Sequence, residues 1–183
     1  MSDTNSFIKL MYGNINTPRY YPIKRAFGQT LSTCPIEALL AYTKLSNTKN
    51  PIDQNIEFLV AGLCYNTVKP FQYEEVNSYV NFEDVVRRYI YADASRKDNR
   101  EKEVEDFLKL RYDMDGYFAT RFYNLAKKVI PYLRSNEQFN YSKLIKDFIF
   151  WNNGNSVKMQ WAMSVVTFND TEDLNTNDEK GEI

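Results

Sequence analysis

The chain has 183 residues, of which 43% are hydrophobic and 26% are charged, and its formal net charge is −1. This length suits one domain, or two small helical lobes that share a core, with ample apolar material to fill it. Six glycines and six prolines are too few for a turn-rich β-sandwich or barrel. No apolar run approaches the roughly 18 residues of a membrane span, and the first residues lack a signal-peptide pattern, so we expect a cytoplasmic protein.

The sequence contains no histidine, which removes several kinds of chemistry. Ser–His and Cys–His nucleophile pairs and histidine-ligated metals are excluded within this chain. The two cysteines, Cys34 and Cys64, are far apart in sequence and are interpreted as buried thiols. Residues 113–116 (DMDG) resemble part of a calcium loop but lack its remaining ligands, so a helix-ending turn is favoured. We therefore expect a protein that is not an enzyme and binds no cofactor or metal.

Acidic residues are concentrated at the C-terminal end of the chain. Residues 170–183 contain six acidic residues against Lys180, a net charge of −5 that leaves +4 for residues 1–168. The end is polar throughout, so residues 169–183 are predicted to be a disordered tail that is dispensable for folding. A charge of +4 is only mildly basic, so local patches must carry any phosphate binding.

Helix-start signals divide the first half of the chain. Thr17 and Pro18 predict a helix over 17–27, Pro35 another over 35–46, and Asn50-Pro51 a third that ends by Pro70. Residues 71–81 have no clear pattern and are predicted to be a loop or a short helix, and Asn81 to cap a helix over 82–92. The periodicity places these residues on the inward faces: Ile36, Leu39, Leu40, Thr43, Ile56, Leu59, Val60, Leu63, Cys64, Phe82, Val85, Val86, Tyr89 and Ile90.

The second half has stronger helical periodicity. Residues 93–103 are highly charged and are predicted to be a linker that runs into a helix ending at about Tyr112. Gly116 precedes a periodic helix, Asn140 is expected to cap the next, and residues 152–155 form a turn before the last. The expected core positions are Val104, Phe107, Leu108, Phe118, Phe122, Leu125, Val129, Leu144, Ile145, Phe148, Ile149, Trp151, Val157, Trp161, Val165 and Phe168.

These elements predict an all-α helical bundle. We expect an N-terminal helical lobe over 1–92, the charged linker over 93–103, a C-terminal helical lobe over 104–168 and the acidic tail over 169–183.

Residues 140–166 resemble the closing helical hairpin of the CasB family. The matching positions are Asn140-Tyr141, Leu144, Ile145, Trp151, Val157-Lys158 and Trp161-Ala162. Residues 23–26, 58–63, 107–113 and 125–129 are similar to family segments in the same order. The chain departs from the family at Glu105 and Asp106, where many members have an arginine pair, and at Asn140, where the family has an aspartate.

The resemblance implies a non-enzymatic small subunit of the type I-E CRISPR surveillance complex, Cascade. Such a subunit is usually present in two copies, contacts other Cascade subunits, guide RNA and target DNA, and steadies the displaced DNA strand, with no membrane involved. Base pairing reads sequence in such complexes, while protein grooves hold the charged strands. The residues expected to contact nucleic acid are Lys24, Arg25, Lys49, Arg111, Arg121, Lys127, Lys128 and Lys158.

The charge pattern alone leaves other interpretations open. On a helical wheel with Phe118 at zero, Lys127 lies near 180° and Lys128 near 280°, so both face outward, as they would on a merely solvated face. The chain could also be a free-standing nucleic-acid-binding protein or an adaptor between protein subunits. Trp151 and Trp161 lie on apolar stripes, which favours the core over base stacking. Arg96, Lys97 and Arg100 alternate with acidic residues and are interpreted as part of the solvated linker, with a mobile basic loop near DNA as the alternative.

Overall fold

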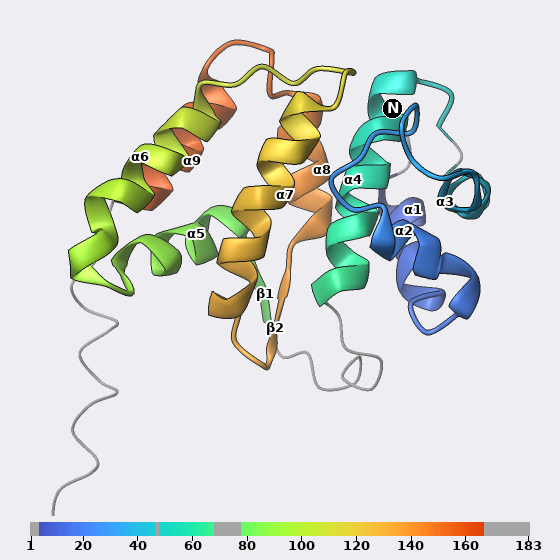
Figure 1. The fold of residues 1–183 in the computed structure, drawn as a ribbon, viewed down its shortest axis with the longest axis horizontal. Helices are drawn as coiled ribbons and strands as arrows, with labels where there is room; N and C mark the ends of the chain where they lie inside the picture. Colours follow the sequence, from blue (N-terminus) through green and yellow to red (C-terminus); the bar gives the residue numbers. More distant parts are fainter. Residues whose placement is uncertain (1–3, 47, 68–77, 167–183) are drawn as a thin grey trace, which may run out of the picture.

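The computed structural model describes residues 4–46, 48–67 and 78–166, which form helices and one pair of short strands (Figure 1). The predicted all-α class is confirmed. Phe168, the acidic tail and residues 71–77 lie outside the described residues. The α-helices are α1 (Thr4–Gly13), α2 (Tyr21–Arg25), α3 (Ile36–Tyr42), α4 (Pro51–Thr67), α5 (Phe82–Tyr91), α6 (Lys97–Leu108), α7 (Tyr117–Val129), α8 (Tyr141–Ile149) and α9 (Ser156–Val166). The 3-10 helices within these ranges are η1 (Pro18–Tyr20), η3 (Ala94–Arg96) and η4 (Ile130–Tyr132).

The two strands form a small parallel sheet that the sequence analysis did not expect. β1 (Ser78–Val80) pairs with β2 (Glu137–Phe139), and Ser78 lies opposite Glu137. Residues 78–80 are therefore a strand rather than a loop or helix. An ion pair between Arg88 and Glu137, 2.5 Å from Nη1 to Oε2, ties β2 to α5.

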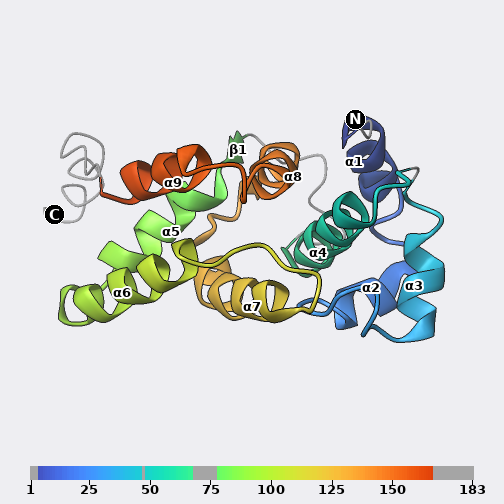
Figure 2. The ribbon, with the colours of Figure 1, turned by 90° about the horizontal axis from the view of Figure 1, so that it is seen from above.

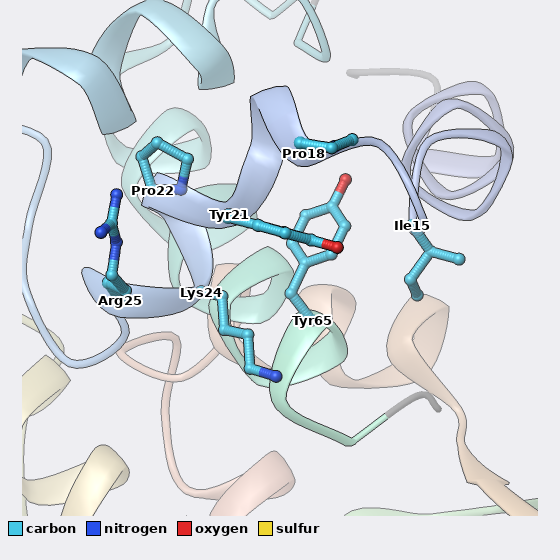
Figure 3. A pocket seen from close by; sticks show the side chains of 7 residues that line it. All are labelled: Ile15, Pro18, Tyr21, Pro22, Lys24, Arg25 and Tyr65. Atoms are coloured by element: carbon cyan, nitrogen blue, oxygen red, sulfur yellow. The ribbon is translucent and has the colours of Figure 1, made fainter. Parts of the chain in front are cut away.

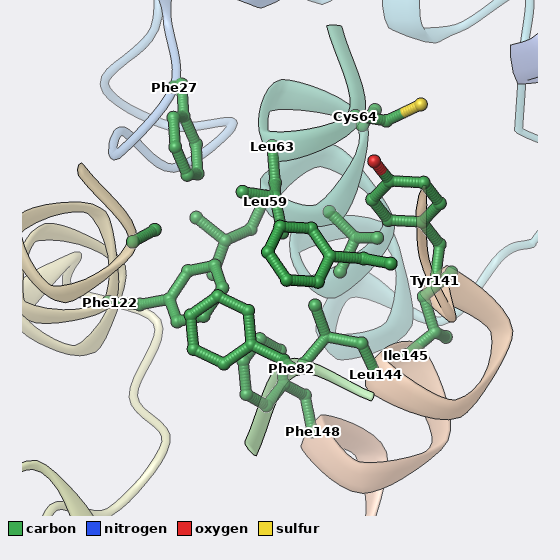
Figure 4. Close-up of a cluster of buried hydrophobic side chains, with 14 of the residues drawn as sticks. Phe27, Leu59, Leu63, Cys64, Phe82, Phe122, Tyr141, Leu144, Ile145 and Phe148 are labelled. Atoms are coloured by element: carbon green, nitrogen blue, oxygen red, sulfur yellow. The ribbon is translucent and has the colours of Figure 1, made fainter. Parts of the chain in front are cut away.

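One hydrophobic core runs through the whole fold. α4 lies at its centre, and every residue from Asn55 to Tyr65 is buried. α2 and α8 pack against α4, while α6, α7 and α9 pack against α5. Side chains from both halves of the sequence meet in this core (Figure 4). These contacts group α5 with α6, α7 and α9, so we propose that the lobes divide between α4 and α5 instead of at residue 92.

Aromatic side chains fill the C-terminal part of the core. Trp151 and Trp161 are buried, with ring centroids 5.2 Å apart, which confirms their prediction as core residues. Both indole N–H groups have acceptors: the Leu110 carbonyl oxygen at 3.0 Å for Trp151, and Asp147 Oδ2 at 2.8 Å for Trp161. Buried indoles need such partners because an unpaired N–H in the core is costly.

The inward face of α3 was predicted incorrectly. Ile36 and Leu40 are 59% and 57% exposed, and the buried residues of α3 are Ala38, Ala41 and Tyr42. The Tyr42 hydroxyl donates to Oε2 of Glu57, a buried carboxylate on α4, at 2.9 Å. This bond holds the Tyr42 side of α3 inward, and a helix of only two turns has too few positions for its apolar residues to outweigh it.

The segment 93–103, expected to be a linker, is largely helical, because η3 and most of α6 lie within it. α6 ends at Leu108 instead of near Tyr112. The Asn152 side chain bonds both the N–H and the carbonyl oxygen of Tyr112, each at 2.8 Å, and so holds this backbone outside the helix.

The turn at residues 113–116 begins a helix instead of ending one. Gly116 has φ of 95°, a left-handed conformation that favours glycine, and directly precedes α7. Asp113 accepts hydrogen bonds from the backbone N–H groups of Gly116 and Phe118, at 3.0 and 3.2 Å. Both of its carboxylate oxygens therefore serve the start of α7.

A network of charged side chains connects α5, α8 and α9. Lys143 Nζ lies 2.7 Å from Glu83 Oε1 and 2.6 Å from Asp147 Oδ2, and Asp147 also accepts from Trp161. Burial would lower the pKa of Lys143, but the two carboxylates raise it overall. Burial also raises the pKa of Glu83, against the opposing effect of Lys143.

Candidate nucleic-acid interface

Most of the predicted basic residues lie on one side of the molecule. α6, α7 and α2 follow one another along this side, which is the lower edge of Figure 2. Lys24 and Arg25 on α2, with Arg121, Lys127 and Lys128 on α7, belong to these helices. The sequence therefore brings five of its eight predicted contact residues onto adjacent elements.

Lys24 and Arg25 stand beside a surface pocket of about 420 Å³ (Figure 3). Both are exposed because Ile23 is fully buried and fixes the opposite face of α2 against the core. The two side chains extend in different directions, with the rings of Tyr21 and Tyr65 also lining the pocket. The arrangement presents two cations next to one exposed aromatic ring, that of Tyr21.

A close contact joins α2 to α7. Gly28 follows α2 with φ of 94°, and a Cβ atom there would lie 2.7 Å from the Cβ of Tyr123. The rings of Phe27 and Tyr123 are 5.1 Å apart, and Lys127 Nζ lies 5.3 Å from the centre of the Tyr123 ring. Lys127 is thereby placed on the flank of α7 that faces α2. We name Lys24, Arg25 and Lys127 the α2–α7 surface.

Lys128 and Arg121 lie on the other flank of α7. Lys128 Nζ is 2.5 Å from Glu103 Oε1 on α6, and Glu103 also accepts from the Tyr89 hydroxyl at 3.0 Å. This ion pair offsets much of the Lys128 charge. Arg121 is half-buried and, seven residues before Lys128, lies within about 20° of it around the helix.

Lys158 and Arg111 form a separate group near the start of α9. Lys158 Nζ donates to the Leu110 carbonyl oxygen at 2.6 Å and lies 5.6 Å from the centre of the Trp151 ring. Burial, and secondarily the nearby charge of Arg111, lowers the pKa of Lys158. Lys158 thus stabilises the loop after α6, whereas Arg111 is exposed. Lys49 is also exposed and lies just before α4.

A second basic pocket, of about 560 Å³, was not predicted from the sequence. It lies between α6, α7 and η4 and is lined by Tyr89, Arg96, Asn99, Arg100, Glu103, Lys128, Pro131 and Tyr132. We call it the α6–α7 pocket. The available signal was the four-residue spacing of Arg96 and Arg100, which puts both on one side of a helix. That signal was lost because the segment was expected to be a linker.

Within the described residues, no group of three or more Cys, Asp or Glu side chains is arranged to hold a metal ion. Among the helices of the same ranges, none combines the length and hydropathy needed to cross a membrane. Cys64 is buried, as predicted, but Cys34 is only half-buried.

No family model matches the chain, and no curated protein matches its sequence. The solved structures that match the fold over most of its length include the following two. M. ruber CasB has a TM-score of 0.64 at 13% identity, and covers 88% of this chain and 91% of its own. A CRISPR-associated protein of the Cse2 family from Thermus thermophilus has a TM-score of 0.66 at 14% identity, covering 90% of this chain and 98% of its own.

The chain has the CasB fold. The resemblance stated from sequence motifs is thereby confirmed at the level of architecture. The match covers nearly all of both neighbours. The similarity to the CasB fold therefore extends over both halves of the chain and is not confined to the helical hairpin at residues 140–166. At 13% and 14% identity, the fold match does not show which residues of this chain contact a ligand.

Proposed function

We propose that the chain is a non-catalytic small subunit of an RNA-guided antiviral surveillance complex of the Cascade type. The observation that carries this proposal is the extent of the fold match, which reaches 91% and 98% of the two neighbours. The name of the Thermus thermophilus neighbour connects the fold with CRISPR systems. In this role the chain contacts other subunits, guide RNA, target DNA and the displaced strand, and two copies are present in each complex.

The α2–α7 surface supports contact with a phosphate backbone. Its three cations are exposed, and they lie on elements locked together by the contact of Gly28 with Tyr123. Cations of this kind bind phosphates without reading sequence and lose affinity as salt rises. Arg121 and Lys128 extend the same side of the molecule, and Arg111 and Lys49 are further candidates. We propose a weaker contribution from Lys158, because its ammonium group is already bonded to Leu110.

A tagged copy of the chain, purified from its own host, tests this function directly. We expect co-purification of several larger proteins and of RNA of one uniform guide length. Ribonuclease treatment of the nucleic acid extracted from the purified sample should remove this band and so identify it as RNA. Purification of the chain alone, with neither proteins nor RNA, would contradict the proposal.

An adaptor that bridges protein subunits is the second candidate. It is favoured by Ile36 and Leu40, which are one turn apart on α3 and more than half exposed. For a pure adaptor, changing both to serine should disrupt assembly, whereas neutralising the α2–α7 surface should change nothing. A loss of nucleic-acid affinity on neutralising that surface, in a complex that still assembles, would exclude the pure adaptor.

A further inference from the structure

The α6–α7 pocket concentrates positive charge in a shaped site. Three of its lining residues are cations (Arg96, Arg100 and Lys128) and one is a carboxylate (Glu103). They come from three consecutive elements, η3, α6 and α7, so the charge does not arise from a single helix face. A pocket lined by three cations and one carboxylate attracts anionic groups.

The aromatic rings of the pocket fix one of its cations. The guanidinium of Arg100 lies 4.6 Å from the centre of the Tyr89 ring and 5.9 Å from that of Tyr132, and it donates to the Tyr89 carbonyl oxygen. Stacking of this kind holds a planar guanidinium in place without neutralising its positive charge. Arg100 is therefore a pre-positioned cation.

The other two cations are held less firmly. Arg96 pairs with Asp93 at 3.5 Å, but the two side chains are 72% and 39% exposed, so the pair contributes little. Lys128 pairs with Glu103 while remaining half exposed. Arg96 and Lys128 can therefore each leave the present acidic partner, or keep it, and bind an incoming carboxylate as well.

The chain carries a strongly acidic segment beyond the end of α9. α9 ends at Val166 and packs against α5 and α6, two of the helices that contribute lining residues. The first acidic residue, Asp170, follows four positions later, and five more acidic residues lie before the end at Ile183. The seventeen residues beyond α9 span up to about 55 Å when fully extended, so the segment is long enough to pass across the helices that α9 contacts. We propose that the α6–α7 pocket binds the chain's own acidic segment, residues 170–182.

Covalent attachment makes this contact effective even if it is weak. A tethered segment acts at an effective concentration in the millimolar range, so an intrinsic affinity of that order is enough for substantial occupancy. The contact is electrostatic and weakens as salt shortens the Debye length to about 8 Å at physiological ionic strength. If the proposed nucleic-acid role is also correct, the segment competes with phosphates for this side of the molecule.

The test compares the full-length chain with a full-length variant whose six acidic residues at 170, 172, 173, 178, 179 and 182 are changed to Asn or Gln. The probe is a fluorescent peptide of residues 169–183, with binding followed by anisotropy at low salt. In the wild type the native segment occupies the pocket, so we expect the neutralised variant to bind the peptide about tenfold more tightly. Equal binding by both chains, or binding by neither, would overturn the proposal.

A second pair of variants, made in the neutralised background, locates the site. Arg96→Gln with Lys128→Gln removes two pocket cations and should reduce peptide binding about tenfold. The control, Lys9→Gln with Lys146→Gln, removes the same charge from exposed positions on α1 and α8 and should leave binding unchanged. An equal loss in both pairs would show general charge attraction and refute the pocket. No nucleic acid is present, so this result is independent of the proposed function.

Discussion

Trp161 illustrates, at the residue scale, how an aromatic side chain suited to base stacking serves the core instead. Its ring lies 5.7 Å from that of Phe82 and 5.2 Å from that of Trp151, and its N–H group is bonded to Asp147. The apolar periodicity of the last helix was enough to predict this burial. The partner of its N–H could not be predicted, because Asp147 and Trp161 are brought together by the packing of two helices.

Trp161→Ala should reduce the free energy of unfolding by about 3–5 kcal/mol, because it empties a large aromatic site in a packed core. Urea unfolding measures the loss. Met159→Ala, on the exposed side of the same helix, is the matched control and should change stability by less than about 0.5 kcal/mol. A Trp161→Ala variant that keeps its stability and loses only nucleic-acid binding would show that the indole is a stacking platform.

At the scale of single helices and strands, the buried face was predicted correctly where a helix is long and packs one face against the core. The expected core positions of α5 and α7 are all buried, and Asn140 caps α8 by accepting from the Lys143 N–H at 3.0 Å. It failed for α3, whose orientation depends on the distant carboxylate of Glu57. It also failed for β1, because a strand of three residues is too short to show alternation and its partner lies far along the chain.

Lys143 connects α5 to α8 through its two ion pairs, so its removal should lower the free energy of unfolding. Lys143→Met leaves the buried carboxylates of Glu83 and Asp147 without their shared cation, so we expect a loss of about 2–4 kcal/mol in urea unfolding. Glu83→Gln should cost much less, because burial already disfavours the ionised form of Glu83, as its raised pKa shows. Equal losses in the two variants would contradict this account.

The Arg88–Glu137 pair should give stability a pH dependence. Bonding to Arg88 lowers the pKa of Glu137 from its ordinary value of 4.5. A carboxyl group whose pKa is lower in the folded state than in the unfolded state stabilises the fold fully when the pH is above its unfolded-state pKa. This stabilisation is lost as the pH falls through its folded-state pKa. Glu137→Gln should therefore be less stable than the wild type by about 1–2 kcal/mol at pH 7. Urea unfolding at several pH values should show the difference shrinking below about pH 4.5; a constant difference would exclude this pair as its source.

For the whole molecule, the order and spacing of motifs predicted the architecture better than any single residue predicted a contact. The helical class and the CasB fold were both identified from sequence, because hydrophobic periodicity extends over most of the chain. The grouping of basic residues was harder, since it depends on which helices lie side by side. Helix packing brings Arg96 and Arg100 into one pocket with Lys128, and it also directs Lys158 toward the Leu110 carbonyl oxygen. Neither arrangement can be predicted from the sequence pattern alone.

We propose that this chain holds nucleic acid through the α2–α7 surface within an assembled complex. The decisive measurement is target-DNA affinity of a reconstituted complex across a salt series. One complex carries Lys24→Gln, Arg25→Gln and Lys127→Gln, and its control carries Lys9→Gln, Lys44→Gln and Lys146→Gln, three exposed cations elsewhere. We predict that both assemble, but that only the first binds DNA more weakly, with a slope of log affinity against log salt smaller by about 2 to 3. Unchanged affinity and slope in the first complex, or an equal loss in both, would contradict the claim.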